Sequence, residues 1–351
     1  MSILLVAGVS TLALSIPTTA ASAATAAAEV DDPVVSGLAG PLQFDLGDHG
    51  QTYIGQAFSG ALTKLRPNGT TTDLLTEPGE VGGVASRGYN VAYTFTGGDE
   101  TNPVALLKLR QANGKVRTIA NLRRFEERNN PDGSQRYGFR NLAPECAAQV
   151  PPEIGGEPYT GLLDAHPYAV ANAPDGGWFV ADAGANAVYH VGKKGKIEVV
   201  WVPRPQKTSI TAEAAAAVGL PECTVGATYA FEPVPTDVEV NAVGMLIVSL
   251  LPGGPEDASL GARGAVYRVD PFDGEWTRLA DGFLGATNVA VAPGGRIYVT
   301  ELFANRISRI YHRQVTTVVD VPSPGAVEFR DGRLFASIDV FANGSIVRVR
   351  P

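Results

Sequence analysis

The sequence is poor in the residues and motifs that mark most enzyme families. Among 351 residues it has only two cysteines, four histidines and two methionines. It contains no GxSxG, HExxH, P-loop or strand-to-helix GxGxxG motif, so the common signatures of hydrolases, zinc proteases and nucleotide-binding enzymes are missing. Basic residues are scattered without an interleaved aromatic stripe and the net charge is -8, which argues against a nucleic-acid partner. With 40 Gly and 25 Pro, the chain is globular in composition and long enough for a large core.

Long hydrophobic runs are absent after the first residues. Residues 3–16, ILLVAGVSTLALSI, form an uncharged apolar run, and the small-residue motif ASA follows at 21–23. This pattern predicts a secretory signal peptide over residues 1–23, although no basic residue precedes the run. A membrane anchor is the alternative, but the run is shorter than the roughly 20 residues that a span requires. We therefore expect a secreted protein without a membrane span once the signal is removed, with a disordered N-terminus at 24–32.

The two cysteines, Cys146 and Cys223, both occur in the tripeptide PEC. In an exported protein, an even number of cysteines favours a disulfide bond. A zinc site is disfavoured because the two thiols are far apart in sequence and no histidine accompanies them. The sequence therefore predicts one disulfide, Cys146–Cys223.

One pattern recurs through the chain. VADAGANAVYHV at 180–191 returns as VTELFANRISRI at 299–310 and as SIDVFANGSIVRV at 337–349. Around each copy, two apolar alternations flank a PGG or DG turn, and a loop and two further strands follow, which predicts a four-stranded antiparallel sheet. The units begin near Pro41, Gly82, Pro167, Thr236, Thr287 and Pro324.

Six such units without a regular helix indicate radial stacking. A period of about 40 residues that is rich in strands is typical of a β-propeller. We therefore expect residues 33–351 to form a single-domain, monomeric, six-bladed propeller of four-stranded antiparallel blades. The last unit lacks an outermost strand, and VVSGL at 34–38 is expected to supply it and close the ring.

Two insertions break the period. Residues 123–163 and 206–234 each carry one of the cysteines, and the second includes the helical stretch TAEAAAAVGL. Both lie in connections that emerge on the same face of the propeller. We expect the disulfide to tie them into a cap of loops and a helix over that mouth of the channel. The alternative is that the bond only restrains two long loops.

Polar residues at the ends of the two inner strands of each blade should meet at the capped mouth. Those of interest lie in blades four to six and are Asp237, Asn288, Glu301 and Asp339. Oxygen ligands that converge in this way suit Ca²⁺, which could polarise a carbonyl group or activate water. The alternative is that they cap backbone N–H groups at strand ends.

His166, in LLDAHPYAV, is the histidine expected at the same mouth, beside Asp164. A histidine with a carboxylate nearby can act as a general base. The alternative is a hydrogen-bonded loop histidine, because no nucleophile motif accompanies it.

The repeats also resemble known propellers. PYAVANAPDGGWFVADAGAN resembles an NHL-type repeat, and VVSGLAGP, HPYAVANAPDGGWFVADAGANAV, PTDVEV and GATNVAVAPGGRIYVTEL together resemble the ScyD/ScyE family of exported bacterial proteins. This resemblance implies a six-bladed propeller but no common reaction. Gluconolactonases and related calcium-dependent lactonases are more distantly similar and hold their metal with Glu, Asn and Asp. Asn288 and Asp237 occupy matching positions, whereas Gln43 replaces the Glu. Streptogramin lyases are similar in blade pattern, but His166 does not match their motif.

Three functions remain open from the sequence. The first is a binding protein that presents the capped channel mouth to a small molecule, a glycan or a protein partner. The second is a metal-dependent lactonase or hydrolase that uses the acidic residues of the mouth, with His166 as its base. The third is a structural protein without a small ligand. The fold alone does not decide among them.

Overall fold

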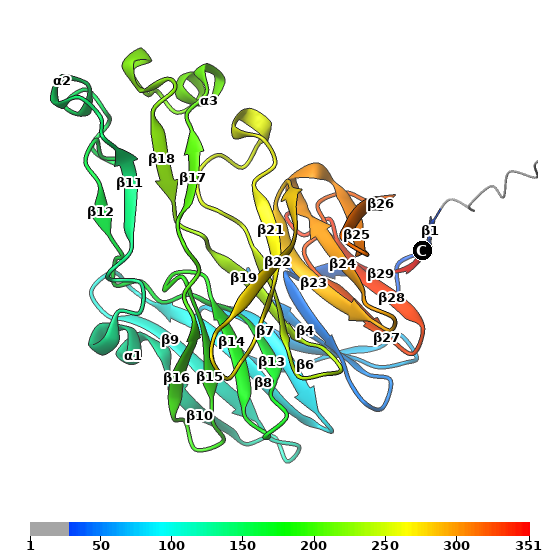
Figure 1. Cartoon of the computed structure of the whole chain (residues 1–351). Helices are drawn as coiled ribbons and strands as arrows, with labels where there is room; N and C mark the ends of the chain where they lie inside the picture. Colours follow the sequence, from blue (N-terminus) through cyan, green and yellow to red (C-terminus); the bar gives the residue numbers. More distant parts are fainter. Residues whose placement is uncertain (1–27) are drawn as a thin grey trace, which may run out of the picture.

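The computed structural model describes residues 28–351 and shows an all-β propeller (Figure 1). The predicted signal peptide at 1–23 lies outside these residues. Blade one comprises β3 (Gln43–Leu46), β4 (Thr52–Gln56), β5 (Ala61–Leu65) and β6 (Thr71–Thr76). Blade two comprises β7 (Glu80–Arg87), β8 (Asn90–Gly98), β9 (Pro103–Arg110) and β10 (Val116–Asn121). Blade three comprises β13 (Pro167–Asn172), β14 (Trp178–Asp182), β15 (Ala187–Val191) and β16 (Ile197–Trp201).

The other half of the ring repeats this order. Blade four comprises β19 (Pro235–Val240), β20 (Leu246–Leu250), β21 (Gly264–Val269) and β22 (Trp276–Phe283). Blade five comprises β23 (Ala286–Ala292), β24 (Arg296–Glu301), β25 (Arg306–Tyr311) and β26 (Gln314–Asp320). Blade six comprises β27 (Val327–Arg330), β28 (Arg333–Ile338) and β29 (Gly344–Arg350). The predicted six-bladed, antiparallel architecture is confirmed.

Apolar side chains that alternate along the strands pack neighbouring blades together. Val188 of blade three and Val248 of blade four, for example, are fully buried in one cluster that spans both blades. The turns between second and third strands use left-handed backbone at Gly60, Asn186 and Asn305, which have φ values of 67°, 50° and 52°. Glycine and asparagine tolerate this region best, so the repeated Gly or Asn of the sequence pattern is explained by backbone geometry.

The N-terminal segment closes the ring as predicted. Strand β2 (Val35–Leu38) pairs antiparallel with β29, with Val35 opposite Ile346. The expectation of disorder at 24–32 is wrong at its C-terminal end, because β1 (Glu29–Val30) also pairs with β29. β2 reaches only the first residues of β29, so the edge at Val349 and Arg350 is free for a second short strand.

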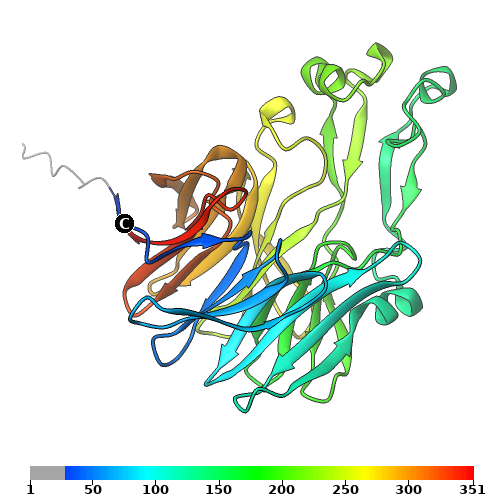
Figure 2. The ribbon, with the colours of Figure 1, turned by 180° about the vertical axis from the view of Figure 1, so that it is seen from behind.

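The two insertions contain loops and short helices, as predicted, and in addition form a sheet that the sequence did not indicate. Their strands are β11 (Arg136–Arg140), β12 (Tyr159–Thr160), β17 (Gln206–Ser209) and β18 (Thr228–Phe231), and they pair in the order β12-β11-β18-β17. We call this the insert sheet. Figures 1 and 2 show that it projects away from the blades and carries short helices at its outer end. The insert sheet is therefore a projection from the propeller and not a further blade.

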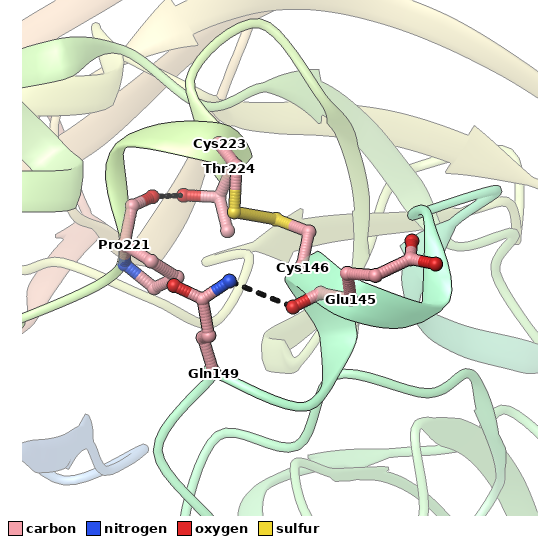
Figure 3. Close-up of a disulfide and its surroundings, with 6 residues drawn as sticks. All are labelled: Glu145, Cys146, Gln149, Pro221, Cys223 and Thr224. Carbon is pink, nitrogen blue, oxygen red and sulfur yellow. Dashed lines mark hydrogen bonds between the residues drawn. A yellow bond between two sulfur atoms is a disulfide. The ribbon is translucent and has the colours of Figure 1, made fainter.

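The helical parts of the insertions are short. They are α1 (Leu122–Asn129), α2 (Pro144–Ala147), α3 (Ala212–Ala217) and the 3-10 turn η1 (Glu222–Thr224), and two further 3-10 turns, η2 (Ala258–Leu260) and η3 (Leu302–Ala304), lie in blades four and five. The predicted disulfide is confirmed: Cys146 in α2 is bonded to Cys223 in η1 (Figure 3). No helix within residues 28–351 is long and apolar enough to cross a membrane.

Candidate functional site

Asp237 and Asn288 lie at equivalent positions on the inner strands of blades four and five, and both side chains are buried. Asp237 Oδ2 accepts a hydrogen bond from the Val289 N–H at 2.8 Å, and Asn288 Oδ1 accepts one from the Val327 N–H at 2.8 Å. Burial raises the pKa of Asp237 to about 7, although the N–H groups of Val289 and Val238 act in the opposite direction. Each side chain therefore joins its own blade to the next one.

Gln43 fills the channel at this level. Its Oε1 accepts a hydrogen bond from Asn288 Nδ2 at 3.0 Å, and its Nε2 donates to the Thr236 carbonyl oxygen at 3.4 Å. Gln43 belongs to blade one, which lies opposite blade four in a ring of six blades. The side chain, only 4% exposed, therefore spans the channel and obstructs it at this level.

Glu301 and Asp339 lie outside the hydrogen-bond network of Asp237 and Asn288. Glu301 is fully buried and accepts hydrogen bonds on both carboxylate oxygens from the Arg306 guanidinium, at 2.7 and 2.8 Å. Its Oε2 also accepts the Leu284 N–H at 3.0 Å. Asp339 is a turn residue with φ 53°, and its backbone N–H donates to the Pro322 carbonyl oxygen. Neither residue hydrogen-bonds to Asp237 or Asn288.

The four predicted ligands do not fit a calcium ion as arranged. The oxygens of Asp237, Asn288 and Glu301 already accept N–H groups, and Gln43 stands where a carboxylate would be required. Within residues 28–351, no three His, Cys, Asp or Glu side chains are placed to hold a metal ion. The alternative interpretation from the sequence, caps of backbone and guanidinium groups, describes these contacts better.

His166 lies at the insertion side of blade three and pairs with a residue that the sequence analysis missed. Its Nε2 is 2.9 Å from Glu80 Oε2, and the two side chains are 37% and 25% exposed. Burial acts to lower the pKa of His166, but the hydrogen bond and charge of Glu80, with the charges of Asp182 and Asp164, raise it overall. Glu80 escaped notice because a bulge between Val81 and Val84 shifts the start of β7.

A second group of carboxylates lies further along the channel. Asp45, Glu239 and Glu328 border a cavity of about 230 Å³ together with Arg330, and Gln43 and Asp237 line the same cavity. Burial raises the pKa of each carboxyl group, and the negative charges of neighbouring carboxylates raise those of Glu239 and Glu328 further. This part of the channel therefore favours protonated acids, and its polar cavity is too small for most organic ligands.

A larger cavity, about 690 Å³, lies between the insert sheet and blade four. We call it the insert pocket. Its walls come from β12, β18, α3 and the loop after β20, and they include Tyr159, Tyr229, Phe231, Val218, Leu260 and the segment 253–255. This volume lies within the range of about 300–1,000 Å³ that is usual for small-molecule sites. No local pattern in the sequence indicated it, because its walls come from distant segments.

The alternation of the insert strands explains the apolar wall. Tyr229 lies opposite Phe139 across the sheet, with ring centroids 4.8 Å apart, and Phe231 follows two residues later on the same face. α3 covers part of this face with the buried side chains Ala214 and Ala215. Because alanine side chains are small, α3 covers the aromatic face of the sheet and still leaves a cavity beside it.

Glu232 provides the polar group of the pocket. Its Oε1 accepts a hydrogen bond from the Tyr159 hydroxyl at 2.9 Å, and its Oε2 accepts one from Asn186 Nδ2 at 3.3 Å. Asn186, the turn residue of blade three, also donates to Asp132 Oδ2 at 3.0 Å and accepts from the Val234 N–H at 3.1 Å. The propeller therefore fixes the orientation of the carboxylate that faces the pocket.

Three more carboxyl groups are buried beneath the insert sheet. Glu126, Asp132 and Asp182 are at most 1% exposed. Burial, with the negative charges of Asp182 and Asp132, raises the pKa of Glu126 to about 8, and burial raises that of Asp182 to about 6. One oxygen of each, Glu126 Oε1, Asp132 Oδ1 and Asp182 Oδ2, has no hydrogen-bond partner within the described part of the chain. At pH 7 Glu126 is therefore mainly protonated and neutral, because burial in this region disfavours negative charge.

Comparison with known proteins identifies a fold but no family. No protein-family model matches the chain, and no curated protein matches it. Among solved structures, virginiamycin B lyase from Staphylococcus aureus is 14% identical with a TM-score of 0.52, and the match covers 92% of this chain and 99% of that one. A putative oxidoreductase (glucose dehydrogenase) from Thermus thermophilus is 14% identical with a TM-score of 0.58, over 92% and 99% of the two chains. The gluconolactonase XC5397 from Xanthomonas campestris is 12% identical with a TM-score of 0.51, over 86% and 82%.

Proposed function

We propose that this chain is an extracytoplasmic binding protein of the ScyD/ScyE type that takes up a small organic molecule in the insert pocket. The observation that carries the proposal is the 690 Å³ cavity lined by Tyr159, Tyr229 and Phe231. Concave, mainly apolar sites with a few oriented polar groups are the usual form of small-molecule sites. The proposed binding site is therefore the insert pocket and not the channel mouth, because Gln43 obstructs the mouth.

The rim of the pocket supports access by a ligand. Leu162 and Val218 are 62% and 43% exposed, although both are apolar and both line the cavity. Exposed apolar side chains next to a concavity are typical of a binding surface. A ligand that enters would bury them.

The disulfide supports a preorganised site. One wall of the pocket comes from the first insertion through Ile154 and Tyr159, and the other from the second insertion through Ile210 and Tyr229. The bond between Cys146 and Cys223 joins these two insertions at the outer end of the sheet. A site whose walls are held together before binding has less entropy to lose when the ligand arrives. The bond also agrees with an oxidising compartment, as expected for a secreted protein.

The proposal is tested by titrating the mature chain with Nile red, an uncharged apolar dye whose fluorescence rises in apolar surroundings. Val218→Trp places a large side chain at the pocket and should weaken dye binding at least about tenfold, whereas Ala217→Trp, at an exposed position of α3 outside the lining, should bind like the wild type. Absence of saturable binding, or equal binding by both variants, would refute the proposal.

A second candidate is hydrolysis of an ester or lactone at the channel mouth. One observation favours it, the partly exposed pair of His166 and Glu80 at 2.9 Å. A histidine oriented by a carboxylate can accept a proton from water. Acid release from a panel of lactones and aryl esters, followed in a pH-stat, should then disappear in His166→Asn. An inactive wild-type protein would exclude this candidate for the panel.

A further inference from the structure

We infer that the insert pocket recognises an organic cation, an apolar body that carries an ammonium or related group. The inference rests on the proposed function, because it specifies the ligand of the same pocket. Glu232 is the residue that would bind the charged group, and the aromatic walls would hold the apolar body.

The charge of the pocket favours a cation. Glu153 and Glu232 both line the cavity, whereas no Lys, Arg or His is among its lining residues. Neither glutamate forms an ion pair with any basic residue in the described range 28–351. An anionic ligand would meet the half-buried carboxylate of Glu232, where repulsion is stronger than in water, and the exposed carboxylate of Glu153 at the rim.

Arg263 is the arginine close to this wall, and its guanidinium is engaged elsewhere. It lies 4.4 Å from the centroid of the Phe231 ring. Its Nη2 donates to the Gly253 carbonyl oxygen at 2.8 Å, and its Nη1 donates to Gln206 Oε1 at 3.1 Å. These contacts hold the guanidinium away from Glu232, with which it shares no hydrogen bond. Arg263 therefore does not compete with a ligand for the carboxylate of Glu232.

The carboxyl group of Asp132 lies behind the pocket, next to Glu232. Asp132 shares the amide of Asn186 with Glu232, so the two carboxylates are neighbours. The charge of Glu232 is among the causes that raise the pKa of Asp132, after burial. Charges in a low-dielectric region act on a ligand over longer distances than charges in water. A cation in the pocket would favour the ionised form of Asp132, whose charge then adds to the attraction of Glu232.

The hydrogen bonds of Glu232 leave capacity for a donor from the ligand. An ionised carboxylate can accept about four hydrogen bonds. Glu232 accepts two in the structure, one from Tyr159 and one from Asn186, and both orient it. An ammonium group offers up to three N–H donors, and a charge-assisted hydrogen bond is about twice as strong as a neutral one.

The aromatic side chains complete the match. Tyr159, Tyr229 and Phe231 all line the pocket. The Arg263 guanidinium already lies over the Phe231 ring, so the tyrosine rings are the ones proposed to contact a ligand cation. The negative face of an aromatic ring attracts a cation, and the attraction is stronger where water is excluded. Carboxylate and aromatic groups on one concave surface therefore select a cation with an apolar body over a neutral molecule of the same shape.

Three indole probes that differ only in the end group test the inference. Tryptamine carries an ammonium, tryptophol a hydroxyl and indole-3-propionate a carboxylate, and each competes with Nile red at pH 7. We expect tryptamine to displace the dye at a concentration at least about tenfold lower than tryptophol, with indole-3-propionate the weakest. In Glu232→Gln, the preference for tryptamine over tryptophol should fall to about twofold or less, with both probes compared against that variant's own Kd for Nile red. Glu157→Gln, an exposed position outside the lining, should keep the wild-type preference.

The outcomes separate the inference from the function on which it rests. If Nile red binds but tryptophol or indole-3-propionate competes as well as tryptamine, the inference is wrong and the binding function stands. If tryptamine is preferred equally by the wild type and Glu232→Gln, Glu232 is not the recognition group and the inference is also wrong. If Nile red does not bind at all, the proposed function fails and the inference fails with it.

Discussion

The channel mouth and the insert pocket contain similar polar side chains, which have different roles in the two regions. At the mouth, the side-chain oxygens of Asp237 and Asn288 accept hydrogen bonds from the N–H groups of Val289 and Val327. Each residue therefore joins two blades. In the insert pocket, the oxygens of Glu232 accept only side-chain donors, and the carboxylate faces a cavity. Asp237 also borders a cavity, but one of only about 230 Å³, and its hydrogen bond to a backbone N–H maintains the fold. Glu232 is held by side chains beside a cavity of about 690 Å³ that is large enough for a ligand.

The largest expected effect is a loss of stability in the insert that leaves the propeller blades unchanged. Replacing both cysteines, Cys146→Ser with Cys223→Ser, should destabilise the insert by about 2–4 kcal/mol, because the bond restrains the unfolded chain. Hydrogen exchange of β11 and β18 should accelerate and Nile red binding should weaken, while the strands of blades five and six stay protected. Loss of protection throughout the propeller would show that the two regions are not independent. Unchanged dye binding would show that the bond does not organise the pocket.

A substitution at the channel mouth should lower the stability of the propeller and leave dye binding unchanged. Asp237→Ala leaves the buried Val289 N–H without its acceptor, so the free energy of unfolding should fall by about 1–3 kcal/mol. Because the pocket is untouched, the Kd for Nile red should equal that of the wild type. Urea unfolding and dye titration measure the two quantities, with the exposed Glu100→Ala as the control for stability. A weaker Kd in Asp237→Ala would place the mouth in the binding site.

The buried acids beneath the insert sheet should appear in the pH dependence of stability. The pKa of Glu126 is about 8 in the folded protein and 4.5 in a model peptide, so folding takes up a proton between these values. The stability that this group contributes is present below about pH 4.5 and is lost as the pH rises towards 8. Glu126→Gln removes the titrating group and should stabilise the protein by about 1–2 kcal/mol at pH 8 relative to pH 5. Identical pH profiles of variant and wild type would contradict a raised pKa.

The smallest effect is expected at His166. Its pair with Glu80 is partly exposed, and such ion pairs contribute about 0–1 kcal/mol. The raised pKa of His166 means that its contribution is present below the unfolded pKa of about 6.5 and is lost as the pH rises through the folded value. His166→Asn should therefore reduce stability slightly at pH 5.5 and hardly at pH 9, without changing the Kd for Nile red. Denaturant unfolding at both pH values checks this, and an equal loss at both would show that the pair is not electrostatic.

The features that were predictable from sequence are those encoded locally. Alternation, turn residues and the period of the repeat predicted the blades, and the missing outer strand of the last unit predicted the pairing of β2 with β29. The disulfide followed from the count and context of the cysteines. The signals for the blades lie within one strand, one turn or one repeat. The closing strand and the disulfide join distant segments, but each was the one pairing that the chain left open: one missing strand and two cysteines.

The site depended on contacts between distant segments. Gly138 pairs with Ala230 in the insert sheet, but neither strand carries a local signal for the other. The positions of Asp237 and Asn288 on the inner strands were predicted, yet their role is decided by N–H groups of the next blade. Likewise, Glu232 lies in an ordinary FEP tripeptide, and only the folded chain brings it to Tyr159 and Asn186.

We expect this protein to bind its ligand in the insert pocket and not at the channel mouth. Nile red titration of the wild type, Val218→Trp and Asp237→Asn under identical conditions tests it most directly. We predict a Kd at least about tenfold weaker for Val218→Trp, which obstructs the pocket, and an unchanged Kd for Asp237→Asn, which alters the mouth. Weaker binding by Asp237→Asn with unchanged binding by Val218→Trp would contradict the account and return the site to the channel.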